Sequence, residues 1–130
     1  MTRRERIYQK YGGRCAYSGT PLEPDWQIDH VEPVQRFWDG RIAAKSRDRE
    51  DNMVPCQRAI NNYKWSYPLE YFRSILLGKL HFRLRKYPYS GKGGERRKRM
   101  EKIAAYFGIT PDMPFSGKFY FEDAKDDNDN

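Results

Sequence analysis

Hydrophobic positions in the first half of the chain are spaced for short elements separated by turns. Residues 2–11 place apolar side chains three and four positions apart and end at two glycines, which predicts a helix. Apolar and polar residues alternate over residues 26–33, which predicts a strand. Residues 52–55 favour a brief extended segment, and residues 56–65 suit a helix. The turn-rich residues 12–24 are expected to form a tight loop before the first strand.

The second half of the chain is dominated by a helical period. Residues 68–77 carry an apolar stripe, with Pro68 in the first turn and Gly78 just past the expected end of the helix. Residues 79–86 and 95–107 also favour helices, because their apolar residues recur at spacings of three and four.

The end of the chain changes its pattern once more. Residues 118–122 predict a short closing strand, and the acidic residues 123–130 predict a disordered tail. We therefore expect an α+β protein, with a small two-stranded ribbon and a helix followed by additional C-terminal helices and the closing strand. One domain would span residues 1–122, with a core over residues 13–66 and a basic helical extension over residues 67–122.

The composition limits the size of the core and points to an anionic partner. Of the 130 residues, 38% are hydrophobic and 33% are charged, so much of the chain faces solvent. The formal net charge is +7, and residues 122–130 contribute −4 to it through five acidic residues and one lysine. Residues 1–121 therefore carry +11, which favours a nucleic acid as partner, with an acidic membrane surface as the second candidate.

Several classes of protein do not fit this sequence. No apolar run reaches the ~18–20 residues that a membrane-spanning helix needs, so no membrane span is expected. The charged N-terminus has no apolar segment of the kind found in signal peptides. Only Cys15 and Cys56 are present, too few for a disulfide framework, and we expect an intracellular, cytoplasmic protein.

Residues that could carry chemistry are spread over three short segments. The first is Asp29-His30, followed shortly by a proline; the second is Asn52, followed by two hydrophobic residues and a proline; the third is Asn61, three residues before Lys64. Each segment alone is commonplace, because a histidine on a strand is more often structural than catalytic and asparagines often form turns. The order and spacing of all three together are specific.

With these segments in this order, residues 13–64 resemble the HNH endonucleases of the phage and bacterial type. The resemblance implies a ββα-metal fold, in which a two-stranded ribbon and a helix surround one divalent metal ion. It also implies that Asp29 and Asn61 bind the metal and that Asn61 belongs to the catalytic set. The adjacent Asn62 is the alternative for the second metal position.

The resemblance further implies a reaction, the hydrolysis of DNA phosphodiester bonds with one metal ion. His30 would be the general base, and Asn52 would brace the loop that carries it. The residue types agree with this reaction, because a neutral histidine can take a proton from water near pH 7. Carboxylate and amide oxygens suit a hard cation such as Mg²⁺ or Mn²⁺. Product ends of 5′-phosphate and 3′-hydroxyl are expected from the resemblance alone.

The chain departs from the family pattern at its cysteines. Many HNH proteins hold a structural zinc ion between two CxxC knuckles, but here each knuckle keeps only its first cysteine, Cys15 or Cys56. Ser18 and Ala59 stand at the other two positions. Because a structural zinc ion takes four ligands, mostly thiolate or imidazole, we expect no structural zinc. The two cysteines are expected to be neighbouring buried thiols.

Basic residues are concentrated in two places, the loop over residues 34–51 and the stretch 79–102, which has ten Lys and Arg against two Glu. A charge run is often only a solvated face, and contact with the phosphates of double-stranded DNA is the alternative. The candidate DNA-binding residues are Arg41, Lys45, Lys64, Arg73, Arg83, Arg85, Lys86, Lys92, Arg96 and Arg97.

Two hypotheses from other functional classes stay open. One is a non-catalytic or weakly active nucleic-acid-binding module that keeps the HNH fold, and the other is a protein-interaction domain, which the high positive charge disfavours. RNA also stays open as a substrate. One active site cuts one strand per encounter with the DNA, so cleavage of both strands needs a homodimer or a second encounter.

Overall fold

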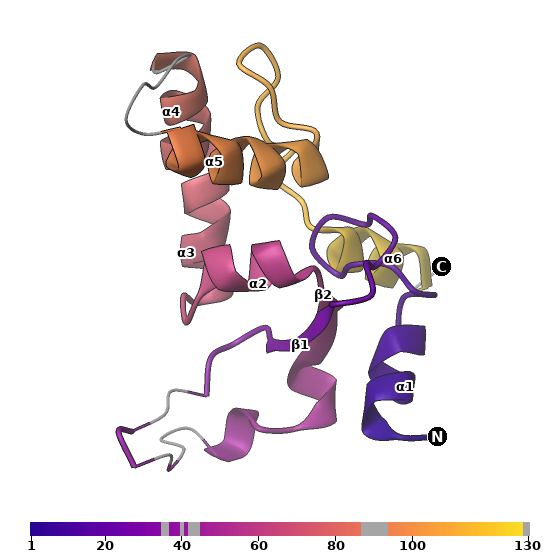
Figure 1. The fold of residues 1–130 in the computed structure, drawn as a ribbon. Coiled ribbons are helices and arrows are strands. Elements are labelled where there is room, and N and C mark those ends of the chain that lie inside the picture. The colour runs from indigo at the N-terminus through magenta and orange to yellow at the C-terminus, as the bar shows by residue number, and fades with distance from the viewer. Residues whose placement is uncertain (35–36, 40, 42–44, 87–93, 129–130) are drawn as a thin grey trace. The chain divides into compact units, whose positions relative to one another are not determined.

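The structure is a computed structural model, and it describes residues 1–34, 37–39, 41, 45–86 and 94–128. It is a mixed α+β structure with one two-stranded antiparallel sheet and several helices, which confirms the predicted fold class at this level (Figure 1). The chain forms two compact units. The first comprises Met1–Leu69 and Phe119–Asn130, and the second comprises Glu70–Lys118. Among the described residues, no helix has the length and apolar character needed to cross a membrane.

The sheet lies in the first unit and consists of β1 (Gln27–His30) and β2 (Met53–Cys56). The two strands are antiparallel, and His30 at the end of β1 lies opposite Met53 at the start of β2. Every residue of β2 is buried, whereas β1 is buried only in part. Both strands form where the sequence predicts extended chain, β1 within residues 26–33 and β2 largely within residues 52–55.

Helix α1 (Arg3–Gln9) packs on β2 and contributes one residue to the small core beside the sheet. Ile7, the only buried residue of this helix, packs with Trp26 and Met53. The N-terminal end of the helix is capped by the Thr2 hydroxyl, which accepts a hydrogen bond from the Glu5 N–H at 3.1 Å. The predicted N-terminal helix is therefore confirmed, and Ile7 is its buried apolar contact with the core beside the sheet.

The side chain of Gln57 joins the end of β2 to the loop that precedes β1, and it is fully buried. Its Nε2 donates to the Thr20 hydroxyl at 3.0 Å and to the Pro21 carbonyl at 2.8 Å. Its Oε1 accepts from the Glu23 N–H at 3.0 Å. A neutral amide thus links the two segments on which the cysteines lie, and α2 (Arg58–Lys64) begins directly after it.

The Gln57→Ala variant should unfold with a free energy about 2–3 kcal/mol below that of the wild type, because it leaves a cavity at a fully buried side chain and removes the partly buried hydrogen bonds to Pro21 and Glu23. Urea denaturation followed by tryptophan fluorescence measures this difference. Arg58→Ala is the matched control, because Arg58 is exposed and adjacent, and it should stay within about 0.5 kcal/mol of the wild type. Equal stability of the two variants would contradict a linking role for Gln57.

Cys15 and Cys56 are buried free thiols, as the sequence predicts. Burial raises the pKa of the Cys56 thiol well above its usual value. Burial also acts to raise the pKa of the Cys15 thiol, but hydrogen bonds from Cys56, Ser18 and the backbone outweigh it and lower that pKa to about 6. The two knuckles are therefore held by thiol contacts and by the Gln57 amide.

The C-terminal segment belongs to the first unit and is helical. The predicted closing strand over residues 118–122 is wrong, because α6 (Tyr120–Asn128) begins within it. The helix also continues across residues 123–128, most of the segment that was predicted to be disordered.

A capping arrangement explains why this segment is a helix. The Glu122 carboxylate accepts a hydrogen bond from the Phe119 N–H at 2.9 Å, as in one half of a capping box. The N–H of Tyr120, which has no partner inside the helix, donates to the Tyr17 carbonyl at 3.0 Å. The alternation of apolar residues that suggests a strand instead reflects Phe119 packing edge-on against the buried Tyr17 ring, with 5.3 Å between ring centroids.

The second unit is built on a long helical run and on α5 (Gly94–Phe107). The run comprises α3 (Leu69–Ser74), η3 (Ile75–Leu80) and α4 (His81–Lys86) without a break. Gly78 does not end a helix as predicted, because η3 is a π-helical stretch that contains it and the apolar stripe continues beyond it.

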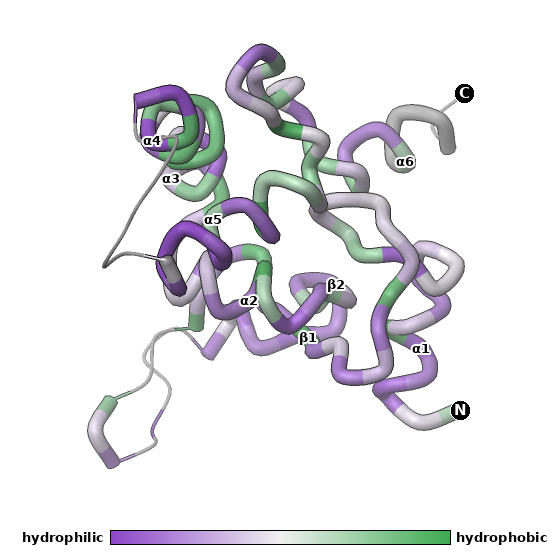
Figure 2. The backbone as a smooth tube through the Cα atoms, turned by 45° about the horizontal axis from the view of Figure 1, so that its top comes forward, coloured by the Kyte–Doolittle hydropathy of each residue, from purple (hydrophilic) through white to green (hydrophobic). Residues whose placement is uncertain are grey.

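Burial in the second unit follows the apolar stripe of the sequence. Figure 2 shows hydrophobic and hydrophilic residues on opposite sides of the run formed by α3 and α4. Among the residues of this unit that the structure describes, the buried apolar ones are Phe72, Ile75, Leu76, Leu80, Leu84, Ile103, Ala104, Ile109 and Phe115. The predicted helices over residues 68–77, 79–86 and 95–107 are thus confirmed in type, with the first two merged into one run.

Candidate active site

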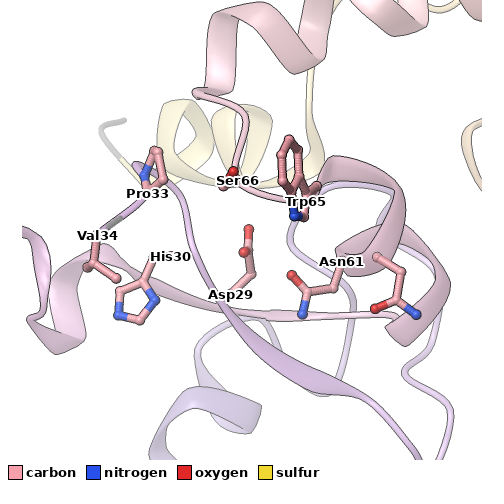
Figure 3. Close-up of a pocket in the computed structure, with 8 residues that line it drawn as sticks. Asp29, His30, Pro33, Val34, Asn61, Trp65 and Ser66 are labelled. Atoms are coloured by element: carbon pink, nitrogen blue, oxygen red, sulfur yellow. The ribbon is translucent and has the colours of Figure 1, made fainter. Parts of the chain in front are cut away.

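A pocket of about 650 Å³ opens in the first unit where β1 ends. Its walls come from β1, the loop that follows, α2 and the turn after α2, and the lining residues are Asp29, His30, Pro33, Val34, Asn61, Asn62, Trp65 and Ser66. Figure 3 shows the Asp29 and Asn61 side chains facing the same opening, with His30 on the far side of Asp29. The pocket therefore brings together residues that are far apart in sequence.

The strand geometry explains how neighbours on β1 reach one pocket. Side chains at consecutive strand positions point to opposite faces, and Asp29 is accordingly buried while His30 is partly exposed. His30 is the last residue of β1, where the chain bends away from the sheet. Because the pocket lies at this strand end, both side chains line it.

The Asp29 carboxylate is held from behind by two buried groups. Its Oδ2 accepts a hydrogen bond from the Tyr17 hydroxyl at 2.5 Å and pairs with the Lys64 Nζ at 3.2 Å. Burial raises the pKa of the Asp29 carboxyl, while the charge of Lys64 and the hydrogen bond from Tyr17 act in the opposite direction. Burial also raises the pKa of the Tyr17 hydroxyl well above its usual value, so Tyr17 remains a donor.

Lys64 lies behind the pocket rather than on the surface. Its side chain is 1% exposed, and its Nζ donates to the His30 carbonyl at 3.1 Å in addition to pairing with Asp29. The prediction that Lys64 faces a DNA phosphate does not agree with this burial. The ammonium group instead compensates the buried carboxylate and ties α2 to the end of β1.

The His30 imidazole is oriented by an acidic residue that the sequence did not single out. Its Nε2 lies 3.0 Å from Oδ1 of Asp48, which follows turn η1 (Lys45–Arg47). Because a carboxylate only accepts hydrogen bonds, Nε2 carries the proton in the neutral ring and Nδ1 keeps its lone pair. Asp48 lies in a polar, mixed-charge loop, and no local signal distinguishes it from the acidic residues near it.

The Asn52 side chain forms hydrogen bonds with the segment that follows β1. Its Oδ1 accepts from the Glu32 N–H at 3.0 Å, and its Nδ2 donates to the Glu32 carbonyl at 2.9 Å and to the Arg47 carbonyl at 2.7 Å. The Asn52 carbonyl also accepts from the Val31 N–H at 2.9 Å. These bonds connect the segment after His30 to the loop that carries Asp48, and so hold both partners of the pair.

The Asn61 amide is oriented by a neighbour on β1. Its Nδ2 donates to Oε1 of Gln27 at 2.6 Å, and no described residue bonds to its Oδ1, which is available to a ligand. Gln27 is a second residue that the sequence analysis missed, because its role depends on the packing of α2 against β1. Asn62 also lines the pocket and is exposed, whereas Asn61 is partly buried.

The donor atoms at this pocket suit a hard divalent cation. In the described part of the chain, the hydrogen bonds of Asp29 involve Oδ2, so Oδ1 remains for a cation, as does Oδ1 of Asn61. No group of three or more His, Cys, Asp or Glu residues that could hold a metal ion is found among the described residues. Mg²⁺ does not need such a group, because it usually keeps several waters and takes one or two protein carboxylates. Asp29 and Asn61 therefore fit the divalent cation that the resemblance implies.

Two candidate DNA-binding arginines are engaged within the second unit. Arg73 pairs with Glu70 at 2.9 Å and donates to the Gly117 carbonyl at 2.6 Å. Arg97 pairs with Glu101 at 2.7 Å, and its side chain is only 13% exposed. Both arginine side chains therefore bind other residues of the second unit.

The other candidate basic residues lie at the surface where the structure describes them. Arg83, Arg85, Lys86 and Arg96 of the second unit are exposed, as are Arg41 and Lys45 of the first. Arg41 also pairs with Asp39 at 2.6 Å. Lys92 lies outside the described residues.

No family model, curated protein or solved structure matches this chain.

Proposed function

We propose that the protein is a metal-dependent endonuclease of the HNH type that hydrolyses DNA phosphodiester bonds. The observation that carries the proposal is a single pocket lined by Asp29, His30 and Asn61, with Asn52 bonded to the chain just after His30. In this proposal β1, β2 and α2 are the ββα-metal core. Asp29 and Asn61 would hold one Mg²⁺ or Mn²⁺ ion, which when bound would stabilise negative charge on the scissile phosphate and its leaving oxygen.

His30 supplies the proton acceptor in this mechanism. Nδ1 of the ring accepts a proton from a water molecule placed in line with the phosphorus. Asp48, 3.0 Å from Nε2, keeps the ring in the required tautomer and stabilises the imidazolium that forms. Asn52 keeps the His30 and Asp48 segments together, so that the base does not have to be reoriented for each reaction.

Exposed cations would attach the protein to the DNA backbone. Residues 1–121 carry a net +11, and exposed arginines and lysines are present in both units. Binding of Lys and Arg to phosphates releases counterions and needs no base recognition. The proposed substrate is therefore double-stranded DNA with little sequence specificity, and a homodimer would be one route to cutting both strands.

Supercoiled plasmid incubated with Mg²⁺ or Mn²⁺ tests the proposal directly. We expect nicked and then linear DNA, and full inhibition by EDTA. DNA binding without cleavage in every metal tested would reject the nuclease and favour the binding module with the same fold. A fluorogenic RNA substrate in the same buffers separates a deoxyribonuclease from an enzyme that also cuts RNA.

The salt dependence of DNA binding should identify which arginines contact phosphates. Arg96→Ala should reduce the slope of log K against log salt concentration by about 0.9, the value for one phosphate contact on duplex DNA. Arg97→Ala is the matched control, because the adjacent Arg97 is held by Glu101 and should leave the slope unchanged. Fluorescence anisotropy between 50 and 200 mM salt, about the range in which such contacts are resolved, gives both slopes. Equal slopes for Arg96→Ala and wild type would remove Arg96 from the interface.

A further inference from the structure

Trp65 is a large apolar residue that stands open to solvent beside the candidate catalytic residues. Its side chain is 70% exposed, and it lines the same pocket as Asp29, His30 and Asn61. Figure 3 shows the indole at the mouth of this pocket, above the Asp29 and Asn61 side chains. The mechanism proposed above makes no use of it.

The backbone at Trp65 is in a conformation that favours glycine. Its φ of 52° and ψ of −131° make it the one residue other than glycine with a positive φ in the described part of the chain. A β-carbon at such a position is strained, and residues of this kind are concentrated at functional sites. A bulky, exposed residue therefore stands at a position where glycine would cause less backbone strain.

Backbone hydrogen bonds hold the turn that carries the indole, and one aromatic ring packs against it. The Trp65 N–H donates to the Asn61 carbonyl at 2.9 Å, and the Tyr67 N–H donates to the Lys64 carbonyl at 3.1 Å. The Tyr67 ring packs edge-on against the indole, with 5.6 Å between ring centroids. Because Lys64 is itself tied to Asp29, the turn that carries Trp65 is coupled to the wall of the pocket. An aromatic face held this way can receive a ligand with little loss of side-chain freedom.

We propose that Trp65 is a stacking platform for a nucleobase of the strand whose phosphate enters the pocket. This inference rests on the proposed function, because it takes the pocket as the phosphate site. The indole offers a flat apolar face, whereas its neighbours on the rim, Asn62 and Ser66, are polar and can bond to a sugar or to the edge of a base. A base can reach the indole only when it is not stacked in a duplex, so the platform would take a base from a strand that is locally opened in the double-stranded substrate.

The test compares wild type and three Trp65 variants on two strands, with binding measured in EDTA so that no cleavage occurs. The strands are a fluorescein-labelled oligothymidylate and a fully abasic strand of the same length, which has the same phosphates but no bases. The proteins are wild type, Trp65→Ala, Trp65→Gly and Trp65→Phe. Wild type should bind the strand with bases roughly tenfold more tightly than the abasic strand, as one stacked base would give.

The variants then separate stacking from a structural role. Both Trp65→Ala and Trp65→Gly should bind the two strands equally, at the wild-type affinity for the abasic strand, and Trp65→Phe should keep part of the preference. Trp65→Gly relieves the backbone strain, so it should resist urea at least as well as Trp65→Ala while binding no better. This pair keeps the test valid if the alanine variant folds poorly.

Three results would overturn the inference. The first is a wild-type protein that binds both strands equally, the second is a Trp65→Gly protein that keeps the wild-type preference, and the third concerns a control. Trp38→Ala serves as a positional control, because it removes an indole that is 96% exposed elsewhere on the first unit and should keep the preference. Loss of the preference in this control would also overturn the inference. Plasmid cleavage without any base preference rejects the platform alone, whereas a base preference without cleavage rejects the nuclease alone.

Discussion

The His30→Ala variant is expected to cleave supercoiled plasmid roughly 10²–10⁴-fold more slowly than the wild type, the range typical of a lost general base. Its affinity for DNA should be unchanged, because His30 is not part of the exposed basic surface. The ring is partly exposed and its described contact is with Asp48. Its removal is therefore expected to leave the protein folded. Quantification of nicked and linear product over time, beside a binding curve in EDTA, gives both values.

Two further variants make this prediction specific to proton transfer. Asp48→Asn should retain more activity than His30→Ala but less than the wild type, because the ring stays in place while its tautomer is no longer enforced. Added imidazole should restore part of the activity of His30→Ala and none of the activity lost in Asp48→Asn. Wild-type nicking by purified His30→Ala would remove His30 from the mechanism.

Replacement of Lys64 by methionine is expected to lower the free energy of unfolding by about 3–5 kcal/mol at pH 7, as when one partner of a buried ion pair is removed. Methionine fills a similar volume, so the loss measures the charge and not a cavity. The variant leaves the Asp29 carboxylate buried with Tyr17 as its remaining described hydrogen-bond donor. Urea denaturation in EDTA measures the effect without a contribution from bound cation.

A double-mutant cycle isolates the ion pair itself. Asp29→Asn removes the charge that Lys64 compensates, so Lys64→Met in that background should cost less than in the wild type. Lys45→Met provides the matched control, because Lys45 is exposed in the same unit and should change stability by no more than about 0.5 kcal/mol. Additive losses from Lys64→Met and Asp29→Asn would show that the two residues are not coupled, contrary to the 3.2 Å contact.

These two predictions concern different faces of the same site. His30 meets the pocket from the end of β1, where the ring can exchange protons with water. Lys64 reaches the Asp29 carboxylate from the protein interior, where its charge stabilises the site without contact with solvent. Loss of the first should remove catalysis and spare stability, whereas loss of the second should reduce stability whether or not the protein is active.

Local pattern predicted the elements that carry the site. The alternation around Asp29 and His30 predicts β1, and residues 56–65 suit the helix that α2 forms, because both signals arise from neighbours in sequence. The pattern failed at residues 118–122, where alternating aromatics suggest a strand. A capping carboxylate and a carbonyl from the distant Tyr17 loop make that segment helical instead.

The residue types of the candidate site, the high positive charge and most of the secondary structure follow from the order of the amino acids alone. The residues that support the site are known only from the folded chain: Tyr17 lies behind Asp29, Asp48 beside His30, Gln27 beside Asn61, and Lys64 in the interior. These partners lie 12, 18 and 34 residues apart in sequence, and Lys64 donates to a carbonyl 34 residues away. Contacts at such separations depend on how the chain packs, and no local spacing records them. The same holds for Trp65, whose backbone conformation and exposure become visible only where α2 ends beside the pocket.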